Sequence, residues 1–243
     1  MKDTIFGIHA VIEALKAQQP IDKIQINREL KADVTAEIKA LAREQNIYVQ
    51  AVPLEKINRI TRKNHQGVIA LMSPIEFHKI ENLLPGLFEQ GKIPFIMVLD
   101  GLTDVRNFGA LVRTAECVGV DAIVIPDKGA ARINSDAMKT SGGALTRVPI
   151  CKAGILPGVI KFLQLSGLKV VGITEKAEES VFEQEFSEPL ALVMGSEETG
   201  ISNQILKRAD HIAKIPMKGK IASLNVSVAA GVAMYEVSRQ RMI

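Results

Sequence analysis

Three polar loops in this sequence carry side chains that could take part in chemistry, and each follows an apolar segment. They span residues 100–116, 192–202 and 215–230. In the first loop, Asn107 and Arg113 offer an amide and a positive charge, which can orient a nucleophile and stabilise developing negative charge. In the third, Ser223 and Asn225 offer a hydroxyl and an amide beside the start of an apolar helix. Each residue alone is more often a helix cap or a surface side chain, so the interpretation depends on the three loops together.

The first loop opens a helix, and its two polar residues have local alternatives. Asn107 suits the N-terminus of that helix, where Asn is a favoured capping residue. Arg113 lies nearly two turns further on and could project toward the sheet edge or a substrate. It could also pair at the surface with Glu116, three residues along the helix. The spacing by itself leaves both roles of Arg113 open.

The second loop contains two glycines at which a ligand could approach the backbone. Gly195 and Gly200 have no side chain to hinder such an approach. The loop matches neither the phosphate-binding pattern G-x-x-x-x-G-K-[ST] nor the dinucleotide pattern G-x-G-x-x-G, and neither pattern occurs elsewhere in the chain. A nucleoside triphosphate or nicotinamide cofactor is therefore disfavoured. The alternative is a plain turn with Ser202 capping the next helix.

The second half of the chain predicts an α/β domain that would bring these loops together. Apolar strand candidates alternate there with helical segments, which is typical of a mostly parallel sheet with helices on both faces. The strand candidates are residues 95–99, 122–125, 170–173 and 190–194. Ligands bind to such sheets where loops leave the carboxyl ends of the strands. The sequence therefore predicts a catalytic α/β domain over residues 94–243.

The first 75 residues predict a smaller α/β domain. Their periodicity indicates helices at residues 5–17 and 33–46 and strands at residues 24–27, 47–52 and 67–72. Proline and glycine then recur from Ser73-Pro74 to Pro94, and such residues interrupt regular structure. We therefore expect an N-terminal domain over residues 1–75 and a linker over residues 76–93.

A cluster of positive side chains in the N-terminal domain is a candidate contact for the phosphates of a nucleic acid. Residues 1–75 contain 11 Lys and Arg against 8 Asp and Glu, and the rest of the chain is neutral. The cluster has only Glu55 as a nearby counter-charge, and with the adjoining histidine it comprises Lys56, Arg59, Arg62, Lys63 and His65. Such a cluster can grip phosphates, although its charge is equally consistent with an ordinary exposed helix end.

The composition indicates a soluble globular protein with a substantial core. The chain has 243 residues, 47% of them hydrophobic, and no apolar run reaches the roughly 18 residues needed to cross a bilayer. The N-terminal region has no secretory signal, so we expect a cytoplasmic protein with no membrane partner. Cys117 and Cys151 are expected as small core residues, with neither a disulfide nor a metal site.

In this order and near these separations, the three loops resemble the signature motifs of the SpoU/TrmH family of SPOUT RNA 2'-O-ribose methyltransferases. The resemblance extends over nearly the whole chain. Residues 7–11 and 65–70 resemble the family's N-terminal substrate-binding domain, and residues 141–144 are similar to a segment between its motifs. The length and layout are most similar to the RlmB-like branch, which methylates a guanosine ribose in 23S ribosomal RNA.

Two positions differ from the family's usual motifs. Val105 follows Asp104 where the first motif usually has proline, and Glu198 stands where the second motif often has glycine. Both differences change the rigidity of a loop more than its chemistry. We therefore expect them to mark a subgroup of active enzymes.

The resemblance implies a fold, a cofactor and a set of site residues. It implies a deep trefoil knot in the C-terminal domain, a homodimer formed through that domain, and S-adenosyl-L-methionine bound by backbone groups of the knot loops, with no metal. The implied cofactor-binding residues are Met194, Gly195, Gly200, Ile215, Met217 and Leu224. The implied catalytic residues are Asn107, Arg113, Glu197, Ser223 and Asn225.

The implied reaction moves a methyl group from a positively charged sulfur to a ribose 2'-hydroxyl. The family's proposed mechanism has Arg113 activate that hydroxyl, but arginine side chains stay protonated in proteins. We therefore expect Arg113 to remain cationic, to hold the target phosphate and to stabilise the developing alkoxide, while that phosphate or water accepts the proton. Asn107 would orient the nucleophile or this arginine.

The RNA target is the least determined part of the prediction. Aromatic residues make up only 4% of the chain and Trp is absent, so recognition should depend on RNA shape and backbone. A guanosine of 23S ribosomal RNA is the expected target, and a transfer RNA ribose is the alternative. A non-catalytic RNA-binding or ribosome-assembly protein with the same fold is a further alternative, against which the retained polar residues of the three loops argue.

Overall fold

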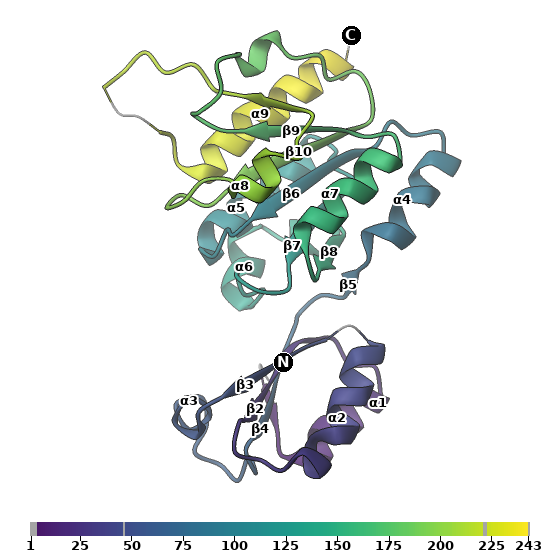
Figure 1. The fold of residues 1–243 in the computed structure, drawn as a ribbon, viewed down its shortest axis with the longest axis vertical. Helices are drawn as coiled ribbons and strands as arrows, with labels where there is room; N and C mark the ends of the chain where they lie inside the picture. Colours follow the sequence, from purple (N-terminus) through teal and green to yellow (C-terminus); the bar gives the residue numbers. More distant parts are fainter. Residues whose placement is uncertain (1–3, 46, 221–222, 243) are drawn as a thin grey trace. The chain divides into compact units, whose positions relative to one another are not determined.

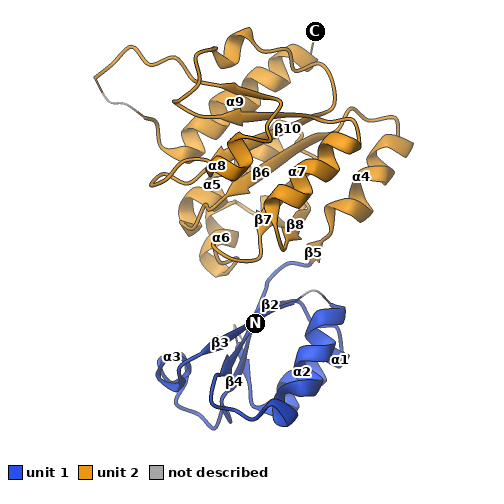
Figure 2. Cartoon of the chain, in the orientation of Figure 1, with its two compact units in different colours: residues 1–76 blue, residues 77–243 orange. Residues whose placement is uncertain are grey.

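The computed structural model describes residues 4–45, 47–220 and 223–242. The chain forms two compact units, Met1–Glu76 and Phe77–Ile243, each with its own sheet (Figure 2). Within the described ranges, no helix combines the length and the apolar character needed to cross a membrane.

The first unit is a four-stranded sheet with helices on both faces. Its elements are β1 (Thr4–Phe6), α1 (Ile8–Lys16), β2 (Ile21–Asn27), α2 (Ala32–Glu44), β3 (Tyr48–Val52), α3 (Leu54–Asn58) and β4 (Val68–Met72). The strand order is β1-β4-β2-β3, and only β2 and β3 run parallel. Ile24, Ile26 and Val68 pack against α1 and α2 on one face, while Ile69 packs with Ile57 of α3 on the other.

The start of the first unit differs from the helix predicted over residues 5–17. Residues 4–6 form β1, which pairs antiparallel with β4, and α1 begins only at Ile8. Gly7 lies between them with φ 93°, a left-handed conformation that favours glycine. Periodicity placed the helix correctly but missed the strand, because three residues are too few to show an alternating pattern.

The second unit contains the remaining elements, named here in chain order. They are β5 (Phe77–His78), α4 (Ile80–Glu89), β6 (Phe95–Asp100), α5 (Val105–Cys117), β7 (Ala122–Pro126), α6 (Ser135–Thr140), η1 (Ala144–Thr146), β8 (Ile150–Ala153), α7 (Leu156–Leu165), β9 (Lys169–Ile173), η2 (Val181–Glu183), β10 (Leu190–Gly195), α8 (Asn203–Leu206), β11 (His211–Ala213) and α9 (Val226–Arg241).

A seven-stranded sheet, ordered β11-β9-β10-β6-β7-β8-β5, forms the centre of the second unit. All its pairings are parallel, which confirms the predicted α/β class. Helices α4 and α7 cover one face, and α5 and α9 cover the other (Figure 1). The central strands are buried on both faces, which explains their continuous apolar sequences. The trefoil knot stays a prediction, because strand order and register do not test it.

The stretch expected as a linker over residues 76–93 is instead built into the second unit. It contains β5, which pairs with β8, and α4, whose Ile80, Leu84 and Leu87 are buried in the core. Pro85 and Gly86, which suggest a loop, lie inside α4. Burial of three large apolar side chains on one helix face outweighs the weak helix propensity of these two residues.

The two cysteines differ in environment, and the expectation for one of them is wrong. Cys151 is buried in the core, and burial raises the pKa of its thiol to about 12. Cys117, at the end of α5, is exposed. It lies on the solvent side of a helix whose buried residues are Phe108, Gly109, Leu111, Val112 and Ala115.

Candidate functional site

The carboxyl ends of β9 and β10 border a cavity of about 670 Å³. Its wall is completed by the loop after β11 and the N-terminus of α9. All six predicted cofactor-binding residues line it: Met194, Gly195, Gly200, Ile215, Met217 and Leu224. Three of the predicted catalytic residues, Glu197, Ser223 and Asn225, line it as well. The structure therefore brings the second and third loops into one pocket.

Strand register places the first loop beside the second. Strands β6 and β10 are parallel neighbours, and Asp100 and Gly195, their last residues, are register partners. The backbone N–H of Ser202 donates to Asp100 Oδ2 at 2.8 Å, which ties the two loops together beyond the strands. The predicted capping role of Ser202 is only partly met: it precedes α8, but its side chain makes no capping hydrogen bond.

The loop after β10 folds tightly onto itself. Ser196 and Gly200 form an isolated antiparallel bridge, and Ser196 Oγ accepts a hydrogen bond from the backbone N–H of Thr199 at 3.1 Å. A Cβ atom added to Gly195 would lie 2.0 Å from the carbonyl carbon of Gly200. Glycine is therefore required at position 195 by this close approach, and the loop presents Glu197 at a defined place.

A carboxylate joins the first and third loops through hydrogen bonds. Glu197 Oε1 accepts from Asn225 Nδ2 at 2.7 Å, from Asn107 Nδ2 at 2.9 Å and from the backbone N–H of Val226 at 3.3 Å. Asn225 Nδ2 also donates to Asn107 Oδ1 at 3.1 Å. Asn107, Glu197 and Asn225 thus form a closed network, so Asn107 is connected to the cavity although it is not among its lining residues.

Capping residues hold the two helices that carry these amides. The N-cap of α5 is Asp104, whose Oδ1 accepts from the backbone N–H of Asn107 at 2.7 Å. The expectation that Asn107 suits the cap position is therefore wrong by three residues, and its side chain is free to reach Glu197. Asn225 caps α9, because its Oδ1 accepts from the backbone N–H of Ser227 at 3.0 Å.

Arg113 lies on the exposed side of α5 and does not line the cavity. Its guanidinium lies beside the turn between α6 and η1, where a Cβ atom added to Gly142 would approach Arg113 Nε at 3.8 Å. The alternative pairing with Glu116 is absent from the described ion pairs, and Arg147 Nη1 instead lies 3.0 Å from Glu116 Oε1. The guanidinium of Arg113 is thus open to a substrate, as its predicted role requires. It makes no contact with the network of Asn107, Glu197 and Asn225.

The end of β9 contributes cavity residues that the sequence analysis missed. Thr174, Glu175 and Lys176 line the pocket directly after the strand. Thr174 Oγ1 accepts from the backbone N–H of Lys176 at 3.4 Å, which shapes the turn. The sequence does contain a signal for these cavity residues, since three polar residues directly follow a buried strand. Neighbouring parallel strands end at the same edge of a sheet, where ligands bind.

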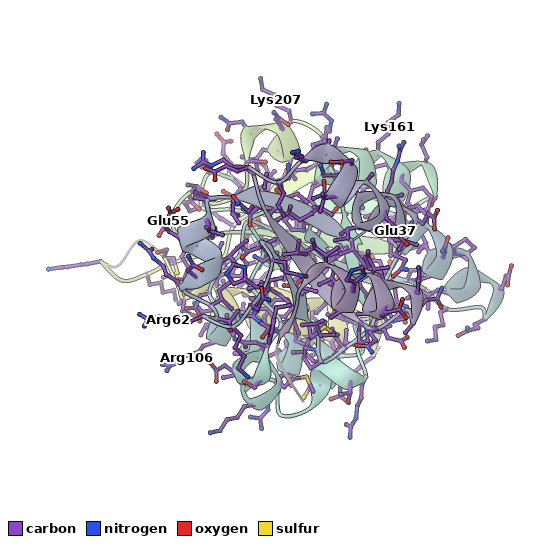
Figure 3. All side chains as sticks on the ribbon, turned by 90° about the horizontal axis from the view of Figure 1, so that it is seen from below. Glu37, Glu55, Arg62, Arg106, Lys161 and Lys207 are labelled. Atoms are coloured by element: carbon purple, nitrogen blue, oxygen red, sulfur yellow. The ribbon has the colours of Figure 1, made fainter. Side chains whose placement is uncertain are left out.

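The lysine and arginine side chains of the basic cluster are exposed, and His65 is half-buried. Lys56 lies on α3, and Arg59, Arg62 and Lys63 follow in the loop that leads to β4. Figure 3 shows the side chains of Arg62 and Glu55 extending outward from the ribbon. Lys63 Nζ lies 5.9 Å from the centre of the Phe6 ring, within the range of a cation–π contact.

His65 has a structural role in this cluster. Its Nδ1 accepts from the backbone N–H of Gly67 at 2.9 Å, so its Nε2 donates to Asn58 Oδ1 at 2.8 Å. The neighbouring Gln66 accepts from the backbone N–H of Ile8 at 3.0 Å, which satisfies one free donor at the start of α1. Both ring nitrogens of His65 are therefore engaged within the protein, and it supports the loop that carries the positive charges.

Metal chemistry has no evident site in the part of the chain that the structure describes. No group of three or more His, Cys, Asp or Glu residues is arranged there to hold a metal ion. Hydrogen bonds among Asn107, Glu197 and Asn225 join the three loops.

Comparisons with known proteins match each unit to a family model. Residues 94–235 match the model of the SpoU rRNA Methylase family, and residues 4–78 match the model described as RNA 2'-O ribose methyltransferase substrate binding. The chain is 35% identical over 239 residues to the putative TrmH family tRNA/rRNA methyltransferase YacO of Bacillus subtilis (strain 168), covering 98% of this chain and 96% of that protein. A putative TrmH family tRNA/rRNA methyltransferase of Staphylococcus aureus (strain MSSA476) is 37% identical over 242 residues, covering 99% of this chain and 98% of that protein.

Solved structures show the same fold. The SpoU methyltransferase AviRb of Streptomyces viridochromogenes, in complex with the cofactor AdoMet, has a TM-score of 0.62 at 22% identity, covering 98% of this chain and 90% of that one. The A. aeolicus TrmH/SpoU tRNA modifying enzyme has a TM-score of 0.57 at 31% identity, covering 67% of this chain and 84% of that one. Two matching family models, relatives covered almost end to end and a shared fold lead to one conclusion: this chain belongs to the SpoU rRNA methylase family.

Proposed function

We propose that this chain transfers a methyl group from S-adenosylmethionine to a ribose 2'-hydroxyl of structured RNA. The observation that carries the proposal is the cavity at the ends of β9 and β10, joined through Glu197 and Asn225 to Asn107 of the first motif. The second and third loops thereby line one pocket, and hydrogen bonds connect the first loop to it through Asn107. Membership of the SpoU rRNA methylase family supports the reaction class.

The residues of the cavity fit the proposed cofactor. Its volume of about 670 Å³ lies within the range of pockets that hold ligands of this size. Met194, Ile215 and Leu224 offer apolar surface for a purine base, and the glycine-containing loop that begins at Gly195 offers exposed backbone groups. When bound, S-adenosylmethionine supplies an activated methyl group on a positively charged sulfur.

The protein's contribution to the reaction is positioning and charge stabilisation. The network of Asn107, Glu197 and Asn225 holds the amide of Asn107 at the edge of the pocket, where it would orient the ribose hydroxyl or Arg113. Arg113 remains cationic, holds the target phosphate and stabilises the oxygen as it loses its proton. That phosphate or a water molecule accepts the proton.

The proposed target is a guanosine of 23S ribosomal RNA. The match of the first unit to a ribose methyltransferase substrate-binding model supports an RNA ribose as the substrate, and the match of the second unit to the SpoU rRNA Methylase model supports ribosomal RNA. A transfer RNA ribose is the second candidate, favoured by the 31% identity to the A. aeolicus TrmH/SpoU tRNA modifying enzyme. Incubation with labelled S-adenosylmethionine and separate ribosomal and transfer RNA pools, followed by mapping of the labelled ribose, distinguishes the two. Label in neither pool would support a non-catalytic RNA-binding protein.

The basic cluster of the first unit is the proposed RNA contact. Its exposed side chains, held on a loop supported by His65, are suited to contact phosphates. Replacing Arg59, Arg62 and Lys63 by glutamine should weaken binding to the substrate RNA and reduce the slope of log affinity against log salt by about two to three. The matched control replaces three other exposed basic residues of the same unit, Lys31, Lys39 and Arg43. Equal losses in both triple variants would contradict a specific role of the cluster.

A homodimer through the second unit is also proposed. Helix α9 has Val228 and Tyr235 on one face, 52% and 55% exposed, two turns apart. Large apolar side chains at this spacing support contact with a second copy. Sedimentation should give a dimer mass for the wild type and a monomer for Tyr235→Glu, whereas the control Leu165→Glu, at an exposed site on α7, should stay dimeric. A monomeric wild type would overturn this part of the proposal.

A further inference from the structure

The cavity has an unequal distribution of charge. Its charged lining residues are the three carboxylates of Glu175, Glu197 and Glu198 and the single ammonium group of Lys176. At neutral pH these side chains give the pocket a formal excess of negative charge. A ligand with more positive charge should therefore bind more tightly here than a ligand of the same shape with less.

The three carboxylates differ in how their charge is compensated. Glu197 accepts hydrogen bonds from Asn107, Asn225 and the backbone N–H of Val226. Glu175 Oε2 accepts a hydrogen bond from Thr174 Oγ1 at 3.4 Å. Glu198 is exposed, and among the described residues no hydrogen bond or ion pair reaches its carboxylate. Glu198 therefore carries the least compensated charge at the pocket.

We propose that Glu198 is a specificity-determining residue that makes the pocket favour the methyl donor over its demethylated product. The inference rests on the proposed function. The donor has a positively charged sulfonium, and loss of its methyl group leaves a neutral thioether. The ammonium and carboxylate of the methionine part are the same in both molecules. The donor thus carries one more positive charge than the product, and the two otherwise differ by a single methyl group.

This discrimination helps turnover, because a product that binds less tightly than the donor leaves the pocket for the next cycle. The effect is modest, since Glu198 is exposed and its field is screened by water and salt. A screened pair of exposed charges changes affinity by about two- to fivefold.

Calorimetric titration of the full chain with three ligands tests the proposal. The ligands are S-adenosylmethionine, S-adenosylhomocysteine and sinefungin, whose amine places a positive charge where the donor has its methylated sulfur. Glu198→Gln should raise the Kd of both cationic ligands about two- to fivefold and leave the Kd of S-adenosylhomocysteine unchanged. The matched control Glu89→Gln, at an exposed carboxylate on α4 outside the pocket, should leave all three Kd values unchanged.

A second measurement needs no variant. In the wild type, the ratio of the S-adenosylhomocysteine Kd to the sinefungin Kd should fall as salt is raised from about 0.05 to 1 M, because the Debye length shortens. The proposal is overturned if Glu198→Gln weakens all three ligands equally, if it changes none of them, or if the ratio does not depend on salt. Failure of all three ligands to bind the wild type would instead refute the proposed cofactor, which keeps the two conclusions distinguishable.

Discussion

At the scale of single residues, the centre of the site is one carboxylate oxygen. Glu197 Oε1 accepts from two side-chain amides and one backbone N–H. A carboxylate can only accept hydrogen bonds, so it forces both Asn107 and Asn225 to present their NH₂ groups to it. Asn225 is oriented further by its capping bond to Ser227. The orientation of Asn107 at the pocket edge is therefore determined by a residue ninety positions away.

Glu197→Gln should lower kcat about 10- to 100-fold, while the KM for S-adenosylmethionine changes less. The new amide brings a donor toward two other donors, which disturbs the network at a cost of about 1–3 kcal/mol. Steady-state methylation kinetics on the substrate RNA measure both parameters. Glu89→Gln is the control for loss of an exposed carboxylate, and an unchanged kcat in Glu197→Gln would remove the network from the mechanism.

Arg113→Lys should retain measurable methyl transfer, with a reduced dependence of rate on RNA concentration. Lysine keeps the positive charge but loses the two-pronged geometry with which arginine holds a phosphate. Single-turnover rates at several RNA concentrations give the comparison, and Arg113→Met, which removes the charge, should be far slower. A rate that rises with pH in step with deprotonation of the lysine would contradict a purely cationic role.

At the scale of elements, two helices and one loop are held in place by close approaches and capping bonds. Gly195 permits the loop after β10 to fold back on itself, and Gly109 in α5 lets α6 approach, since a Cβ atom there would lie 2.1 Å from Thr140 Oγ1. Helix α9 is anchored at its far end by Arg241. The guanidinium donates to the carbonyls of Glu188, Ile93, Phe186 and Pro94 at 2.6 to 3.4 Å.

Gly195→Ala should weaken S-adenosylmethionine binding by about tenfold or more. The added methyl group cannot fit 2.0 Å from Gly200, so the loop must move and its pocket residues move with it. Calorimetry measures the Kd. The control is Gly86→Ala, at a helical position with open space around the new methyl group, which should leave the Kd unchanged.

Arg241→Met should destabilise the protein by about 2–4 kcal/mol, because four carbonyl oxygens lose their donors in a half-buried place. The same burial lowers the pKa of Arg241. Urea unfolding measures the change in the free energy of unfolding. Lys161→Met, at a side chain that extends into solvent from α7 (Figure 3), should change it by less than about 0.5 kcal/mol. Equal stability of the two variants would refute the anchoring role.

At the scale of the whole molecule, the two units have separate sheets and separate cores. The first buries its own apolar residues around a four-stranded sheet, and the second does so around seven strands. The cavity and the network of Asn107, Glu197 and Asn225 lie entirely within the second unit. Stability of the second unit can therefore be followed by a probe in its core.

Alkylation of the cysteines by iodoacetamide provides that probe. Cys117 should react rapidly in the native protein, because it is exposed. Cys151 should react only when the second unit unfolds, because the core excludes the reagent and burial raises the pKa of its thiol to about 12, so little thiolate exists at pH 8. Mass spectrometry of Cys117→Ser across a urea gradient should follow the unfolding transition. Rapid labelling of Cys151 without urea would show that this part of the core opens in the native state.

The sequence by itself determined the local pattern of this protein. Apolar runs located the strands β6, β7, β9 and β10 to within a residue or two, and their alternation with helices determined the α/β class. These features depend on side chains close together in the chain, which periodicity can read. The three loops and their order also carried the resemblance to the family, which the comparisons confirm.

Only the tertiary structure decided which side chains meet. The bond between Asn107 and Glu197 spans ninety residues, and it depends on the parallel register that sets Asp100 beside Gly195. Tertiary packing also stabilises α4 in the segment that was expected to be a linker, and it places Thr174 at the cavity. Contacts of this kind arise from burial and strand register across the whole sheet, and no local stretch of sequence contains that information.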